Sequence, residues 1–106
     1  AIVDFITNVE QINSIKPDTF KLYDNYPNPF NPTTKIKFDI SDNSRSDVTL
    51  TVYDTNGKEV AKLLNGNLQP GTYEVEWNAS SLSSGIYFYR LQMGYFIETK
   101  KMIVLK

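Results

Sequence analysis

The side chains that most often perform chemistry in proteins are missing from this chain. It contains no histidine and no cysteine among its 106 residues. These two residue types supply the usual general base, the thiol nucleophile, disulfides and the usual zinc ligands. No pair of carboxylates stands in an apolar context, where acid–base chemistry would need it. The sequence therefore predicts a protein that is not an enzyme, with no catalytic residue, no cofactor and no metal site.

Two short motifs could carry chemistry of another kind. The run from Asp42 to Asp47 has acidic ends that weakly resemble a calcium loop. Its spacing does not reproduce an EF-hand and no glycine occupies the sharp turn, so we interpret it as a solvated turn. Asn78-Ala79-Ser80 has the form of a glycosylation acceptor. This triplet is common by chance, and we give it no weight.

The most distinctive segment is residues 26–32, in which three prolines and two asparagines surround one phenylalanine. Proline restricts its own φ and the conformation of the residue before it, so the segment is nearly rigid before the chain folds. We expect it to close one end of the fold, with Tyr26 and Phe30 filling the core. A rigid segment also presents a constant shape to a partner, so a role in recognition remains open.

The elements that must position this segment are β-strands. Ile36, Phe38 and Ile40 alternate with polar residues, which is the period of a strand with one buried and one solvated face. The pair Asn56-Gly57 between two such runs predicts a hairpin turn. The same alternation elsewhere predicts a buried core that contains Phe38, Leu50, Val52, Tyr73, Trp77, Tyr87 and Leu91.

The segment 86–93 is apolar on both faces, so its orientation needs a further argument. Arg90 lies on one face, which favours burial of the other, formed by Tyr87, Tyr89, Leu91 and Met93. A tyrosine just after Gly85 also suits the tyrosine corner of immunoglobulin-like sandwiches. Ile86 and Phe88 then point outward, either as a docking patch or as scattered apolar surface.

About seven strands follow one another at spacings of roughly ten residues, without helical periodicity from Phe20 onward. The sequence therefore predicts an all-β fold, an immunoglobulin-like antiparallel β-sandwich that covers residues 18–106. Residues 1–17 give no clean face, and we predict a linker or the tail of a preceding domain, with an extra edge strand as the alternative.

Charge argues against nucleic acid as a partner, and hydropathy argues against a segment that spans a membrane. Eleven basic and twelve acidic residues leave a net charge of −1, and no basic run could neutralise several phosphates, so nucleic acid is not expected. No apolar stretch reaches the roughly 20 residues that span a bilayer. Neither property indicates an oligomeric state.

A family resemblance rests on blocks that keep their order along the chain. They are Phe20-Lys21-Leu22, residues 25–34, 50–54 and 57–60, Gly71-Thr72-Tyr73, Trp77-Asn78, residues 84–87 and Lys100-Lys101-Met102. In this company Pro27-Asn28-Pro29-Phe30-Asn31-Pro32 is highly specific. From residue 18 to residue 106 the chain resembles the C-terminal sorting domain of type IX secretion substrates, which is related to the immunoglobulin-like domain of flagellar hook-capping proteins.

The resemblance implies a non-catalytic sorting signal fused behind an N-terminal cargo domain. Its partners would be an outer-membrane translocon and a sortase-type peptidase that cuts upstream, here between Val9 and Asp18. The localisation implied is the periplasm in transit and then the cell surface or the extracellular space. For partner recognition we select the proline-rich segment and the lysines of the closing strand, which we expect on its exposed side: Tyr26, Pro27, Asn28, Pro29, Phe30, Asn31, Pro32, Lys100, Lys101 and Lys106.

Two other functions remain open at this point. The first is a structural or adhesive immunoglobulin-like spacer. The second is a carbohydrate-binding module that would use exposed aromatic side chains such as Tyr53, Phe88 or Tyr95. A coplanar row of exposed rings would favour the second.

Overall fold

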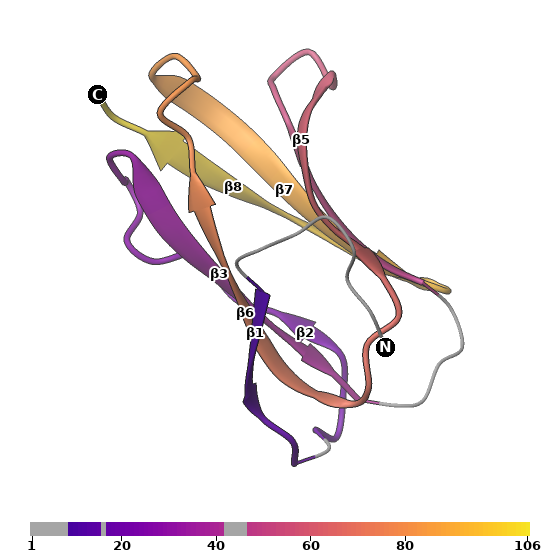
Figure 1. Cartoon of the computed structure of the whole chain (residues 1–106). Helices are drawn as coiled ribbons and strands as arrows, with labels where there is room; N and C mark the ends of the chain where they lie inside the picture. The colour runs from indigo at the N-terminus through magenta and orange to yellow at the C-terminus, as the bar shows by residue number, and fades with distance from the viewer. Residues whose placement is uncertain (1–8, 16, 42–46) are drawn as a thin grey trace.

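The fold consists of two packed antiparallel sheets, as a computed structural model of residues 9–15, 17–41 and 47–106 shows (Figure 1). The described residues form strands and no helix. One sheet has the order β1-β6-β3-β2 and the other β5-β4-β7-β8. The strands are β1 (Val9–Asn13), β2 (Lys21–Leu22), β3 (Thr33–Ile40), β4 (Val48–Tyr53), β5 (Glu59–Gly66), β6 (Gly71–Asn78), β7 (Gly85–Met93) and β8 (Phe96–Val104). The predicted all-β, immunoglobulin-like sandwich is confirmed.

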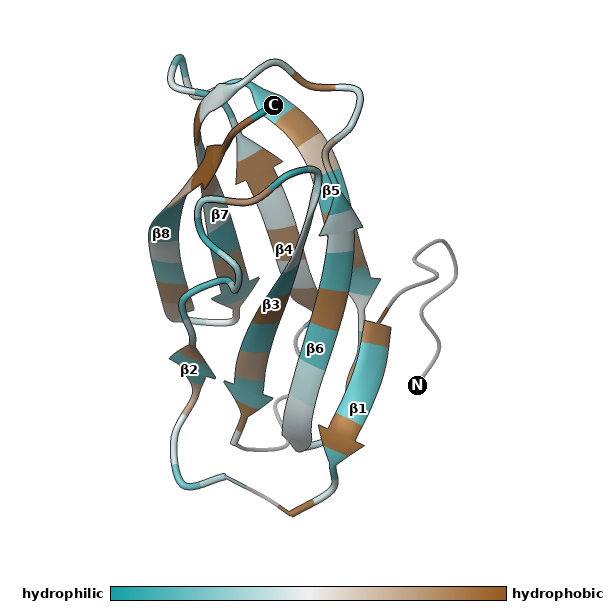
Figure 2. Cartoon of the chain, turned by 90° about the vertical axis from the view of Figure 1, so that its left-hand side faces the viewer, coloured by the Kyte–Doolittle hydropathy of each residue, from teal (hydrophilic) through white to brown (hydrophobic). Residues whose placement is uncertain are grey.

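The core lies between the sheets because strands such as β3 and β6 alternate apolar and polar residues, a banding that Figure 2 shows along both. In the pairing of these two strands Phe38 stands opposite Tyr73, and their rings stack with centroids 5.7 Å apart. All seven residues predicted for the core are buried, including Trp77.

Strand β7 has the orientation predicted for it. Tyr87, Tyr89, Leu91 and Met93 are buried, and Ile86 is exposed. The Tyr87 hydroxyl donates a hydrogen bond to the Ser83 carbonyl at 2.9 Å, four residues upstream. This is the type of contact that a tyrosine corner makes, and it holds the loop before β7 against the sandwich.

The predicted hairpin joins β4 and β5 through residues 54–58. Gly57 has a φ of +82°, a conformation that favours glycine. The Asp54 carboxylate accepts hydrogen bonds from the Asn56 and Lys58 amides at 2.9 and 3.0 Å. The Asp54 side chain therefore holds the turn in place.

Strand β1 is the element that the linker interpretation of residues 1–17 missed. Val9–Asn13 pairs with β6 as an antiparallel edge strand, so for these residues the alternative interpretation is correct. The seven predicted strands correspond to β2–β8, and β1 is the eighth. Residues 1–8, Lys16 and most of the weak calcium-like motif, from Asp42 to Ser46, lie outside the described residues.

Candidate functional site

The proline-rich segment, residues 26–32, bridges the two sheets. At its start Tyr26 and Lys35 of β3 exchange two backbone hydrogen bonds, each 3.0 Å long. Further on, the Phe30 amide donates to the Ile103 carbonyl at 3.0 Å, and the Leu105 amide donates to the Phe30 carbonyl at 2.9 Å. The segment is therefore attached to the first sheet at one end and to the closing strand β8 of the second sheet at the other.

Phe30 fills the core at this end of the sandwich, as predicted. Its side chain is only 2% exposed, and its ring centroid lies 6.0 Å from that of Trp77.

Tyr26 does not fill the core, because its side chain is 80% exposed. Residues paired across antiparallel strands place their side chains on the same face. The partner of Tyr26 is Lys35, an exposed residue on the outer face of β3. The pairing therefore directs the Tyr26 ring outward, and the prediction for this residue was wrong.

A small polar network of side chains holds the start of the proline-rich segment in place. The buried Asn25 side chain donates to the Thr34 hydroxyl at 3.0 Å and to the Pro27 carbonyl at 3.3 Å. The Thr34 hydroxyl donates to the same carbonyl at 2.9 Å. Sequence reasoning missed this network, although polar residues on both sides of a proline cluster are a usable indication of it.

The other members of the segment lie at the surface or hold its ends. Pro27, Asn28, Pro29 and Asn31 are exposed. The Asn28 side-chain oxygen accepts a hydrogen bond from the Ile103 amide at 3.0 Å, and the Pro32 carbonyl accepts one from Ala79 at 2.8 Å. Asn28 thus occupies part of the free edge of β8, which would otherwise present unpaired backbone groups.

The three selected lysines lie in three different environments. Lys101 is exposed on the outer face of β8. The Lys106 amide donates to the Ser84 hydroxyl oxygen at 2.9 Å, and its ammonium contacts the Ser80 carbonyl. Both agree with the prediction of an exposed position.

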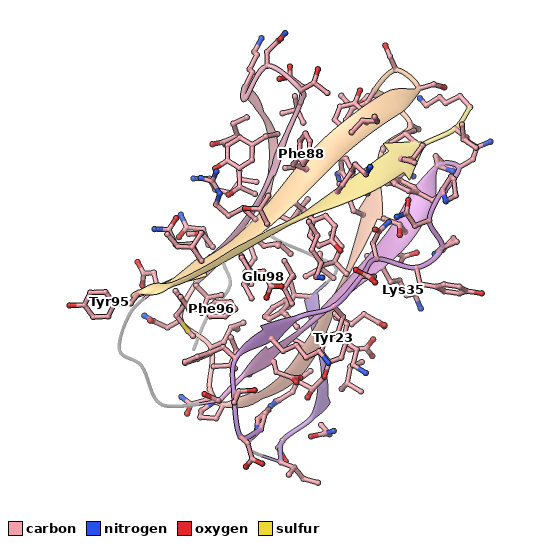
Figure 3. All side chains as sticks on the ribbon, turned by 180° about the vertical axis from the view of Figure 1, so that it is seen from behind. Tyr23, Lys35, Phe88, Tyr95, Phe96 and Glu98 are labelled. Carbon is pink, nitrogen blue, oxygen red and sulfur yellow. The ribbon has the colours of Figure 1, made fainter. Side chains whose placement is uncertain are left out.

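Lys100 departs from that prediction because strand alternation places it on the inner side of β8, with Met102. Its side chain is only 29% exposed, and its ammonium lies 3.2 Å from the Asp24 carboxylate and 3.8 Å from that of Glu98. Figure 3 shows Phe96 and Glu98 on this same side, toward the other sheet. Lys100 is therefore part of the seam between the sheets.

This seam runs along β8 from end to end. The Phe20 and Phe96 rings lie 5.5 Å apart, and the Leu22 amide donates to the Glu98 carboxylate at 3.4 Å. Asp24 then meets Lys100, and Phe30 pairs with Val104 in the parallel sense. Residues 20–30 therefore accompany β8 in parallel and place the proline-rich segment beside the last strand.

The tyrosines with raised pKa values lie outside the candidate site. The pKa of Tyr23 is raised mainly by its hydrogen bond to the Asp39 carboxylate, at 2.7 Å, and further by burial. Burial also raises the pKa values of Tyr73 and Tyr89. Their hydroxyls donate to the backbone carbonyls of Gln69 and Tyr23, which is a structural use of tyrosine.

Within residues 9–15, 17–41 and 47–106, no group of three or more acidic side chains is arranged to hold a metal ion. In the same part of the chain, no helix has the length and apolar character to cross a membrane.

The domain is a small immunoglobulin-like sandwich, and residues 26–32 and β8 together form one surface at its edge. The family model described as the secretion system C-terminal sorting domain matches residues 24–105. The chain thus belongs to the family of type IX secretion C-terminal sorting domains, and it carries a sorting signal for export to the cell surface or the extracellular space. A comparison with curated proteins finds no match.

Proposed function

We propose that this domain is a non-catalytic sorting module that directs an N-terminally fused cargo through the periplasm to an outer-membrane translocon. The observation that carries the proposal is the attachment of the proline-rich segment to β8 by the backbone bonds of Phe30. This attachment joins the proline-rich segment and the lysine-bearing strand β8 into one continuous surface. A translocon component can then bind both at once.

The surface is suited to recognition because it is rigid before binding. Prolines restrict its backbone, and hydrogen bonds hold Tyr26 and Phe30 at its two ends. A partner that binds a preorganised surface loses less conformational entropy than one that must order a loop. The exposed Tyr26 ring can serve as an anchor, since tyrosine is enriched among residues that dominate binding energy.

On their burial and bonding, we divide the selected residues into candidates for contact and supports of the fold. Phe30 fills the core, and the Lys100 ammonium lies 3.2 Å from the exposed Asp24 carboxylate at the seam between the sheets. The Pro32 carbonyl accepts a hydrogen bond from the Ala79 amide. The residues available to a translocon are Tyr26, Pro27, Asn28, Pro29, Asn31, Lys101 and Lys106.

The sortase-type peptidase would act on the exposed chain after β1. Val9–Asn13 is paired with β6, whereas Ser14 and Ile15 are exposed and lie outside any strand. Proteases cut extended, accessible segments in preference to paired strands. We therefore place the junction after Asn13, within the range that the resemblance implies.

The carbohydrate-binding function receives less support from the aromatic side chains. Arg90 lies over the Tyr53 ring, 4.8 Å from its centre. Tyr95 lies at the tip of the β7–β8 hairpin, far from Phe88 (Figure 3). The three rings do not form the row that a sugar-binding surface would need.

Export of a reporter tests the proposed function. The full chain, fused behind a periplasm-targeted reporter, is expressed in a host with a type IX system, and Tyr26→Ala is compared with Phe30→Ala. We expect Tyr26→Ala to keep the melting temperature of the native domain and to lower the export rate about tenfold, because it removes an anchor without opening a cavity.

Phe30→Ala is the matched control. It should lower the free energy of unfolding by about 3–5 kcal/mol, since Phe30 is a buried aromatic residue. A native reporter fusion that stays inside the cell would contradict the sorting function. Normal export of the folded Tyr26→Ala variant would remove Tyr26 from the recognition surface.

A further inference from the structure

The outer face of the second sheet has an apolar corner that a solvated face does not require. Ile86 pairs with Ile103 across β7 and β8, and Tyr53 pairs with Phe88 across β4 and β7. We call these four residues the apolar corner. Ile86 is 42% exposed, and the other three are half-buried.

Apart from Ile97 near the start of β8, the rest of this face is polar, as expected for a sheet with one side in water. Thr51 stands opposite Arg90, and Arg90 stands opposite Thr99. Thr49 stands opposite Gln92. Apart from Ile97, the apolar residues are therefore gathered at one end, beside the attachment of the proline-rich segment to Ile103. A contiguous patch of this kind marks an interaction site more often than isolated apolar residues do.

Cations border the corner. Lys101 is paired with Phe88 in register, Arg90 lies over the Tyr53 ring, and Lys62 of β5 stands opposite Thr51. Within the described residues none of the three forms an ion pair. Glu59, opposite Tyr53, is the one carboxylate in the paired rows of this face.

The first sheet shows the contrasting arrangement. On its outer face Lys35 stands opposite Glu76 and Lys37 opposite Glu74, so each cation has an anionic neighbour. The Lys35 ammonium also lies 3.9 Å from the Glu74 carboxylate. The first sheet therefore neutralises its own charges, whereas the second presents an excess of positive charge around an apolar centre.

We propose that the apolar corner docks an acidic protein surface with an apolar centre, which belongs to the component of the secretion system that reads this domain. The inference rests on the proposed function and adds the face and the chemistry of the partner. Apolar contact provides the anchor, and charge complementarity orients the two surfaces and speeds their encounter. Because Ile103 belongs both to the corner and to the attachment site, one partner can cover the corner and the proline-rich segment together.

The test uses the full chain fused to the periplasm-targeted reporter. Ile86→Thr combined with Ile103→Thr removes the apolar centre and keeps residues that favour strands. The matched control is Ile97→Thr, which is also on the outer face of β8 and 56% exposed, but at the opposite end of the strand. We expect export to fall about tenfold for the double variant and to stay at the native rate for the control.

Lys101→Glu is a second variant that leaves the apolar residues in place. It should also reduce export, and raised salt should weaken binding of the native domain to isolated outer-membrane vesicles from the host. Native export by both the double variant and Lys101→Glu would overturn the inference while leaving the sorting function intact. An equal loss of export in the Ile97→Thr variant would also overturn the inference.

Two further results have distinct meanings. A native fusion that is not exported would contradict the proposed function itself. Analytical ultracentrifugation of the purified domain gives the second result. If the native domain is a dimer and the Ile86→Thr, Ile103→Thr double variant is a monomer, the corner binds a second copy of the chain, and the inference of an acidic partner is overturned.

Discussion

At the scale of single residues, tyrosines serve this domain in opposite ways. Tyr89 is fully buried and its hydroxyl donates to the Tyr23 carbonyl at 2.8 Å, whereas Tyr26 points its ring into solvent. Both have the same side chain, so their roles depend on where the backbone aims them. The buried tyrosines connect loops to strands, and the exposed Tyr26 is available to a partner.

The buried hydroxyl of Tyr89 predicts a loss of stability at alkaline pH. Burial raises the pKa of Tyr89 above the ordinary value of about 10. The unfolded chain therefore loses this proton first, so the stabilisation is complete below about pH 10 and is lost as the pH rises further. Tyr23 and Tyr73, whose pKa values are also raised, act in the same direction.

Tyr89→Phe should reduce the alkaline decline and cost about 1 kcal/mol at neutral pH through the lost hydrogen bond. Urea unfolding of both proteins at pH 7 and pH 11 measures the two effects. An unchanged difference between the two pH values in the variant would contradict the assignment to Tyr89.

At the scale of elements, the edge strand β1 depends on a glycine in its neighbour. Gly71 begins β6 with a φ of +150°, and a Cβ atom there would lie 2.7 Å from the Asn13 carbonyl oxygen and would also meet the Gln11 side chain. Only a residue without a Cβ atom lets β1 approach this closely. The β1–β6 pairing is therefore specified by β6 as well as by β1.

Gly71→Ala should lower the free energy of unfolding by about 1–3 kcal/mol and loosen β1. Gly85→Ala is the matched control, because Gly85 has nearly the same φ, +152°, but open space at the Cβ position. Both variants should lose stability, and only Gly71→Ala should speed hydrogen exchange of the β1 amides relative to those of β3. Equal exchange in the two variants would show that backbone strain alone accounts for the effect.

At the scale of the whole molecule, the last strand closes the sandwich as well as bordering the candidate site. Met102 and Val104 are fully buried, and Phe30 takes its backbone partners from Ile103 and Leu105. The same residues thus contribute to stability and to the surface offered for recognition. A deletion at this end cannot separate the two roles.

Removal of residues 102–106 should unfold the domain. The loss of each large buried side chain costs about 2–5 kcal/mol, and the total stability of a small domain is about 5–15 kcal/mol. Circular dichroism during heating should show no cooperative transition in the truncated chain. A cooperative transition near the native temperature would contradict a closing role for β8, and the folded truncation would then report on recognition alone.

The faces of the strands were predictable from the sequence because alternation is a local property. Each apolar residue at a period of two identifies its own side of the sheet, so Phe38, Trp77 and Leu91 were assigned to the core without knowledge of their partners. The motif around Phe30, together with the other blocks in their order along the chain, supported the resemblance to a sorting domain.

The candidate site depended on contacts between residues far apart in the sequence, and only the tertiary structure decided these. Pairing with Lys35 turned Tyr26 outward, and residues 20–30 placed Asp24 beside Lys100. The attachment of Phe30 to Ile103 joins positions whose proximity no local pattern specifies, because it follows from how the two sheets close on each other. The side of a strand is therefore encoded locally, whereas the neighbours that convert separate residues into one surface exist only after the sheets pack.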